Sequence, residues 1–175
     1  ALGAKLAHDL RRDRLELGST PVWDLNDGSV IGAVSAPRWP HARDGEALVD
    51  LAVRSGLGPD LGRWIVRHAI AAAAAPPTGN QIVVDVPPGL VAQPAFVSWV
   101  AEELAAHRLD PGRLVLAIGE VELSDTDLVR PVLDGLDALG ASVALAAFGS
   151  GPSSLALFSS MRVPAVADRE ALVLR

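Results

Sequence analysis

Arg38, Trp39, Asp85 and Glu120 are side chains of this 175-residue sequence that could take part in binding a ligand. Arg38 is followed directly by Trp39, and a guanidinium forks onto phosphate oxygens while an indole ring offers a π face for stacking. Asp85 and Glu120 each stand near the end of an apolar run, and two carboxylates together could hold a hydrated cation or do general acid–base chemistry. The structural alternative is an ion-paired arginine, a packed tryptophan and two solvated carboxylates, and residue type alone favours it.

Other catalytic and binding chemistries find no support in the sequence. The absence of cysteine excludes thiolate nucleophiles and a disulfide framework. The four histidines are scattered without i,i+4 spacing, which argues against a zinc centre. The net charge of −6 disfavours a nucleic-acid polymer as partner, and no apolar run approaches the roughly 20 residues of a membrane span. We therefore expect a cytoplasmic protein that neither binds nucleic acid polymers nor inserts into a membrane.

Apolar periodicity predicts strands that alternate with helices. Helices are expected over 1–14, 45–75 with a break near 56–59, 94–107, 126–139 and 153–161. Strands are expected over 21–25, 29–34, 81–86, 113–118 and 142–147, with a weaker candidate at 165–167. The first two strands flank Asn26-Asp27-Gly28, which is a strong hairpin signal. Repeated strand–helix units with continuously apolar strands indicate an α/β fold built on a parallel sheet or barrel.

The motifs resemble those of the EAL domain family, in the family's order, along almost the whole chain. Residues 144–155, ALAAFGSGPSSL, resemble the family signature A-L-D-D-F-G-T-G-Y-S-S-L. Residues 34–39, VSAPRW, resemble the naming motif E-A-L-x-R-W, and residues 15–22 resemble the family's opening strand. The resemblance implies a (β/α) TIM-type barrel with an N-terminal hairpin. It also implies kinship with metal-dependent phosphodiesterases that open cyclic di-GMP.

The resemblance places four apolar side chains where the family carries metal-binding carboxylates. Val34 stands at the glutamate of the naming motif, and Ala117 stands at the first glutamate of L-x-L-E-I-T-E. Ala146 and Ala147 stand at the two adjacent aspartates of the signature. Methyl groups provide no oxygen ligand for Mg²⁺ or Mn²⁺, so we expect neither ion as a cofactor.

Four other positions keep a polar or aromatic group that could serve a vestigial ligand site. Arg38 and Trp39 match the naming motif, and Glu120 matches the second glutamate of L-x-L-E-I-T-E. Asp85 replaces a metal-binding asparagine of the family. Because the metal-bridged phosphate contacts are missing, we expect cyclic di-GMP to bind weakly or not at all.

The length of the chain bears on its assembly. A complete eight-stranded barrel typically needs about 250 residues and at least about 200, whereas this sequence ends after about six predicted strands. We therefore expect one EAL-like domain over residues 1–175 with a C-terminally shortened, incomplete barrel. The open sheet edges favour a partner, and residues 163–175 are expected to cover one edge as helix or strand. By the resemblance alone, the domain is a C-terminal module of a larger signalling protein.

These observations lead to one hypothesis and two alternatives. The hypothesis is a catalytically inactive, regulatory EAL-like domain of bacterial cyclic di-GMP signalling that acts by binding another protein or by dimerising. The first alternative is a cyclic di-GMP receptor that binds the nucleotide without cutting it. The second is an active phosphodiesterase with unusual ligands.

Overall fold

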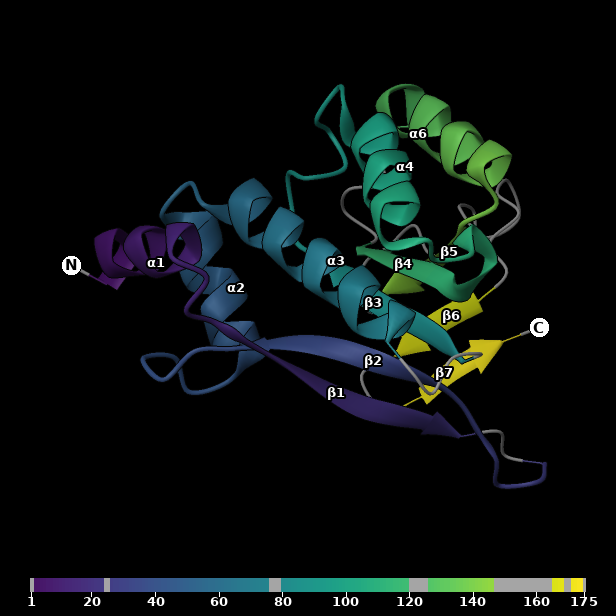
Figure 1. Ribbon diagram of the computed structural model, residues 1–175. Coiled ribbons are helices and arrows are strands. Elements are labelled where there is room, and N and C mark those ends of the chain that lie inside the picture. The colour runs from purple at the N-terminus through teal and green to yellow at the C-terminus, as the bar shows by residue number, and fades with distance from the viewer. Residues whose placement is uncertain are drawn as a thin grey trace.

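The computed structural model describes residues 2–23, 26–75, 80–119, 126–146, 165–168 and 171–174. Within these ranges the chain forms one sheet in the order β1-β2-β3-β4-β5-β6-β7, with the helices along one side of it (Figure 1). The helices are α1 (Leu2–Arg11), α2 (Gly45–Arg54), α3 (Gly58–Ala74), α4 (Phe96–His107) and α6 (Thr126–Leu139), with a 3-10 turn at Pro111–Arg113. The strands are β1 (Glu16–Trp23), β2 (Val30–Arg38), β3 (Gln81–Val86), β4 (Leu114–Gly119), β5 (Ser142–Ala146), β6 (Ala165–Asp168) and β7 (Ala171–Leu174).

The pairing of the strands gives the fold its class. β1 and β2 form an antiparallel hairpin, the neighbours from β2 to β6 are parallel, and β7 returns antiparallel to β6. Parallel strands joined by helices on the outer side are the repeating unit of a TIM-type barrel. The strand order is linear, so β1 and β7 are the outer strands of the described sheet. The predicted α/β fold with an N-terminal hairpin is confirmed, and the described sheet is consistent with a TIM-type barrel that is partial or unclosed.

Most predicted elements lie where periodicity places them, and the first hairpin shows the largest difference. Both of its strands extend further from the turn than predicted, because the small and polar residues from Glu16 to Thr20 pair in register with β2. The strand predicted at 165–167 is confirmed as β6, and β7 pairs with it to form the edge. The helix predicted at 153–161 falls outside the residues that the structure describes.

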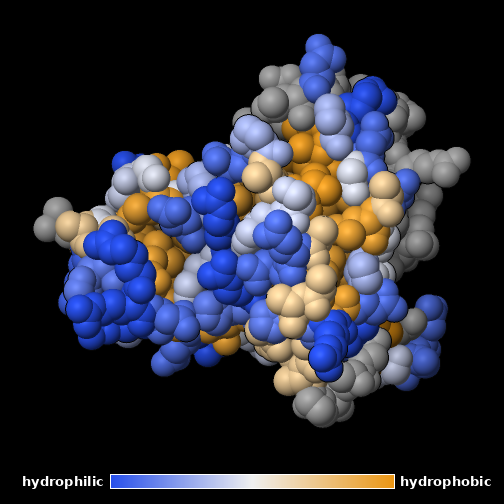
Figure 2. Space-filling model, turned by 45° about the horizontal axis from the view of Figure 1, so that its top comes forward, coloured by the Kyte–Doolittle hydropathy of each residue, from blue (hydrophilic) through white to orange (hydrophobic). Residues whose placement is uncertain are grey.

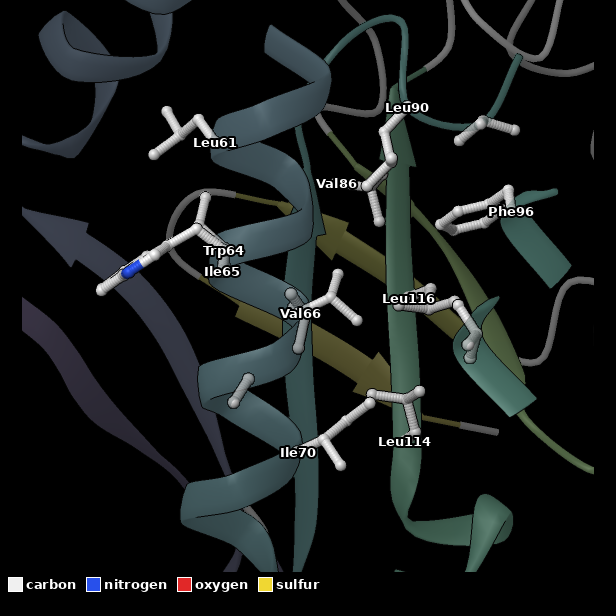
Figure 3. Close-up of a cluster of buried hydrophobic side chains, with 14 of the residues drawn as sticks. Leu61, Trp64, Ile65, Val66, Ile70, Val86, Leu90, Phe96, Leu114 and Leu116 are labelled. Atoms are coloured by element: carbon white, nitrogen blue, oxygen red, sulfur yellow. The ribbon is translucent and has the colours of Figure 1, made fainter. Parts of the chain in front are cut away.

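The main core lies between the helices and the outer face of the sheet. Ile65, Val66 and Ile70 of α3 are at most 1% exposed and face β3 and β4 (Figure 3). Leu116 of β4 and Phe96 of α4 belong to the same cluster (Figure 3). Burial of each such side chain contributes about 1.5–3 kcal/mol, so this layer holds the strands rigidly in register.

The surface on the helical side mixes hydrophilic and hydrophobic areas (Figure 2). Among the described residues, the large hydrophobic side chains that remain exposed are those of Leu2, Trp23, Val30 and Val53. None of the described helices combines the length and the apolar character needed to cross a bilayer.

Candidate functional site

The inner face of the sheet, opposite the helices, carries the candidate site. Successive side chains of a strand point to opposite faces. On β3, Ile82 and Val84 belong to the helix-facing core, whereas Val83 belongs to a separate inner cluster and Asp85 follows it on that face. The carboxyl ends of the parallel strands meet along one rim of this face, where TIM-type barrels place their active sites.

Three of the four positions predicted to have lost a metal ligand meet on this inner face. Ala117 is fully buried, and Val34 and Ala146 are half-buried. They come from three strands that the sheet brings together, since Val34 lies beside β3 and Ala146 lies beside Gly119 of β4. The fourth position, Ala147, is outside the described residues. The inner cluster consists of Val83, Val115, Ala117 and Ala144, with Val34 and Ala146 packed against it.

Asp85 is the carboxylate that the structure places among these apolar side chains. It lies at the carboxyl end of β3 and pairs in register with Ala117. Its side chain reaches solvent, yet the surrounding protein removes enough water to raise the pKa of the Asp85 carboxyl above its usual value. Desolvation is the cause of this shift. Glu120, the second predicted carboxylate, lies outside the described residues, so its distance from Asp85 is not defined.

The described residues on this face do not fit the metal centre that the family resemblance implies. Hard divalent cations take several oxygen ligands, and here the side chains of Val34, Ala117 and Ala146 offer only hydrocarbon. No group of three or more His, Cys, Asp or Glu side chains lies close enough to hold a metal ion in the described part of the chain. The described part of the inner face therefore offers surfaces for packing and few oxygen ligands for a cation.

Arg38 ends β2 at the same rim and is exposed. It pairs in register with Glu16 of β1, so the two side chains leave the sheet on the same face. Its guanidinium leans back across Gly18, where an added Cβ would lie 2.5 Å from the Arg38 Nε. Neither Arg38 nor Glu16 has an ion pair or a side-chain hydrogen bond within the described ranges.

Trp39 follows Arg38 but is packed inward. It is 4% exposed, and its Nε1 donates a hydrogen bond to the Asp9 Oδ2 at 3.0 Å. The His41 ring stands edge-on to the indole, with 4.8 Å between the ring centroids. This position matches the structural interpretation of a tryptophan packed under a loop. Stacking on a ligand base would require the indole to leave Asp9, which is itself buried.

A cavity of about 460 Å³ opens beside Arg38 and was not predicted from the sequence. Its lining comes from the start of β1, the end of β2 and the loop that leads into α2. Glu16 lies 22 positions before Arg38, so spacing alone gave no signal that the two residues share a pocket. The lining residues are Glu16, Ala36, Pro37, Arg38, Trp39, Pro40, Ala42, Arg43, Asp44 and Gly45.

Residues 4–172 match the family model of the EAL domain. The chain belongs to the EAL domain family. An uncharacterised signalling protein of Caulobacter vibrioides is 35% identical over 164 residues, which are 89% of this chain and 20% of that protein. The bifunctional diguanylate cyclase/cyclic di-GMP phosphodiesterase MucR of Pseudomonas aeruginosa is 29% identical over 86% of this chain and 24% of its own length. The chain thus spans about a fifth to a quarter of these relatives.

Solved EAL domains share the fold. The structure of the PaMucR phosphodiesterase in complex with cyclic di-GMP has a TM-score of 0.81 and 27% identity, covering 95% of this chain and 73% of that one. The EAL domain of Mycobacterium smegmatis DcpA has a TM-score of 0.72 and 29% identity, and the match covers 89% of this chain and 66% of that one. The inner face and rim described above therefore belong to an EAL-type barrel.

Proposed function

We propose that this EAL domain does not hydrolyse cyclic di-GMP and acts in cyclic di-GMP signalling as a regulatory domain. It would do so by binding another protein or a second copy of itself. The observation that carries the proposal is the apolar cluster on the inner face, where Val34, Ala117 and Ala146 supply hydrocarbon instead of oxygen ligands.

The physical reason concerns the attacking water. Metal-dependent phosphodiester hydrolysis uses bound cations to lower the pKa of a water molecule and to neutralise the phosphate charge. A divalent cation placed beside these methyl groups would give up hydration without gaining ligands. Asp85 provides a carboxylate on this face, but one carboxylate supplies too few oxygen ligands to fix a catalytic cation.

The first experiment measures hydrolysis directly. The purified domain is incubated with cyclic di-GMP and Mg²⁺ or Mn²⁺, and the linear product is quantified by chromatography, with the MucR phosphodiesterase domain as a positive control. We expect no product above the enzyme-free background. Metal-dependent turnover that is lost in Asp85→Ala but kept in Asp50→Ala would overturn the proposal. Asp50 is a suitable control because it lies on the exposed surface of α2, in an ion pair with Arg54.

A non-hydrolysing cyclic di-GMP receptor is the second candidate. The exposed Arg38 favours it, because a guanidinium at the rim is available to a phosphate. The relative PaMucR was solved in complex with cyclic di-GMP. We expect any affinity to be weaker than about 1 µM, since one charged contact rarely supplies tighter binding. Calorimetry with and without Mg²⁺ tests this, and binding tighter than about 1 µM that disappears in Arg38→Ala would favour the receptor.

A further inference from the structure

The cavity beside Arg38 combines two charges with apolar walls. At about 460 Å³ it falls within the range of about 300–1,000 Å³ typical of small-molecule sites. Pro37, Pro40 and Ala42 line it with hydrocarbon. Glu16 and Arg38 both contribute to its lining and carry charges of opposite sign.

Glu16 and Arg38 both line the cavity and do not form an ion pair with each other. Glu16 and Arg38 are cross-strand partners in β1 and β2, a position in which opposite charges commonly pair. No ion pair joins them, and among the described residues neither has another side-chain partner. The Arg38 guanidinium lies over Gly18, where an added Cβ would meet its Nε, Cζ and Nη2.

The other charges of the lining already have partners. Arg43 Nε donates to Asp44 Oδ2 at 2.8 Å, and Asp44 Oδ1 accepts the Ala47 backbone N–H at 2.8 Å as the N-cap of α2. The side chain of Arg43 is largely exposed, and that of Asp44 is about half exposed. The lining therefore offers one unpaired cation and one unpaired anion, which suits a ligand that carries both charges.

We propose that this cavity binds a free amino acid with an aliphatic side chain, whose carboxylate pairs with Arg38 and whose ammonium group pairs with Glu16. A guanidinium matches a carboxylate with two parallel hydrogen bonds, and a carboxylate accepts from an ammonium group. The aliphatic side chain of the ligand would lie against the prolines and Ala42. The inference rests on this cavity and not on whether the domain hydrolyses cyclic di-GMP.

The experiment compares three related probes by calorimetry or ligand-observed NMR. L-leucine carries both charges, N-acetyl-L-leucine carries only the carboxylate, and L-leucinamide carries only the ammonium group. We expect L-leucine to bind saturably with a Kd of about 0.1–1 mM, and each single-charge derivative to bind about tenfold more weakly. Equal binding of all three probes, or no binding of L-leucine, would overturn the proposal.

Variants of the lining test the assignment of each charge. Arg38→Gln and Glu16→Gln should each weaken L-leucine binding about tenfold, while circular dichroism confirms that the domain is folded. Gly18→Ala should also weaken binding without changing any charge, because its Cβ displaces the Arg38 side chain. Gly119→Ala is its matched control, since an added Cβ there meets nothing within 4 Å. Unchanged binding in both charge variants would place the ligand elsewhere and overturn the proposal.

Hydrolysis of cyclic di-GMP and binding of L-leucine are measured on the same preparation, and each measurement tests a different proposal. Hydrolysis of cyclic di-GMP together with L-leucine binding would overturn the proposed function and leave the amino-acid site standing. If neither hydrolysis nor L-leucine binding is detected, the proposed function stands and the amino-acid site is overturned. The two proposals therefore fail independently.

Discussion

At the scale of single residues, Asp85 shows how aliphatic surroundings act on a carboxyl group. The described side chains of the inner cluster beside it are aliphatic, and desolvation raises the pKa of its carboxyl. A raised pKa means that the charged form is less favourable in the folded protein than in the unfolded chain. Folding stability is therefore lost as the pH rises from the unfolded value of 3.8 through the folded pKa.

Asp85→Asn should consequently be more stable than the wild type at pH 7. The advantage should disappear below pH 3.8, where both states of the wild-type carboxyl are protonated. Thermal unfolding from pH 3 to pH 8 measures the difference, with Asp50→Asn as an exposed control. A difference that does not change with pH would show that packing or hydrogen bonding, rather than desolvation of the charge, decides the effect.

At the scale of elements, one side chain joins the end of α3 to the strands beneath it. Arg113 Nη2 donates to the Ala73 carbonyl at 2.9 Å, and its Nε donates to the Asn80 carbonyl at 3.0 Å. Ala73 lies in the last turn of α3, where helix carbonyls lack partners within the helix, and Asn80 directly precedes β3. The side chain thus fixes how the helix returns to the sheet.

Arg113→Met should keep most of the packing of the side chain and remove both hydrogen bonds. We expect a loss of about 1–3 kcal/mol in the free energy of unfolding, because two carbonyls lose a charged donor. Urea denaturation measures the change, and Arg130→Met, at an exposed position of α6, should change it by less than about 0.5 kcal/mol. Equal effects in the two variants would show that Arg113 has no special role.

The helices and strands also show which parts of the fold can be predicted from the sequence. β3 lies at the predicted 81–86, because its apolar run ends at two prolines that cannot continue a strand. Periodicity missed the first half of β1, because Glu16 to Thr20 lacks apolar alternation and pairs with β2, whereas the family resemblance placed an opening strand over residues 15–22. The candidate cavity was missed for the same reason. Its charges come from segments that only the hairpin register brings together.

Contacts between residues far apart in the sequence also limited the prediction of the candidate site. Trp39 was a candidate for stacking because it follows Arg38, but its hydrogen-bond partner Asp9 lies 30 residues earlier. The sequence itself shows that Val34, Ala117 and Ala146 are apolar, and the motifs predict that they stand at metal-ligand positions of the family. That these side chains pack into one cluster follows from the parallel register of β2–β5 and not from any local pattern.

At the scale of the whole molecule, the first hairpin offers a surface for self-association. Trp23 and Val30 are cross-strand partners and are 54% and 39% exposed. They lie at the end of the β1–β2 hairpin, away from α1 and α2 (Figure 1). Pro21 removes one backbone donor from β1, the outer strand, so we expect contact through the apolar side chains rather than continuous strand pairing.

We therefore expect the domain to dimerise in a concentration-dependent manner through this hairpin, since an exposed tryptophan is a frequent centre of protein contacts. Light scattering over a dilution series measures the dimer, and Trp23→Ser should raise its dissociation constant about tenfold or more. Val53→Ser is the matched control, because Val53 is similarly exposed but lies on α2. A monomer at every concentration would contradict self-association, and a stronger effect of Val53→Ser would move the contact from the hairpin to the helices.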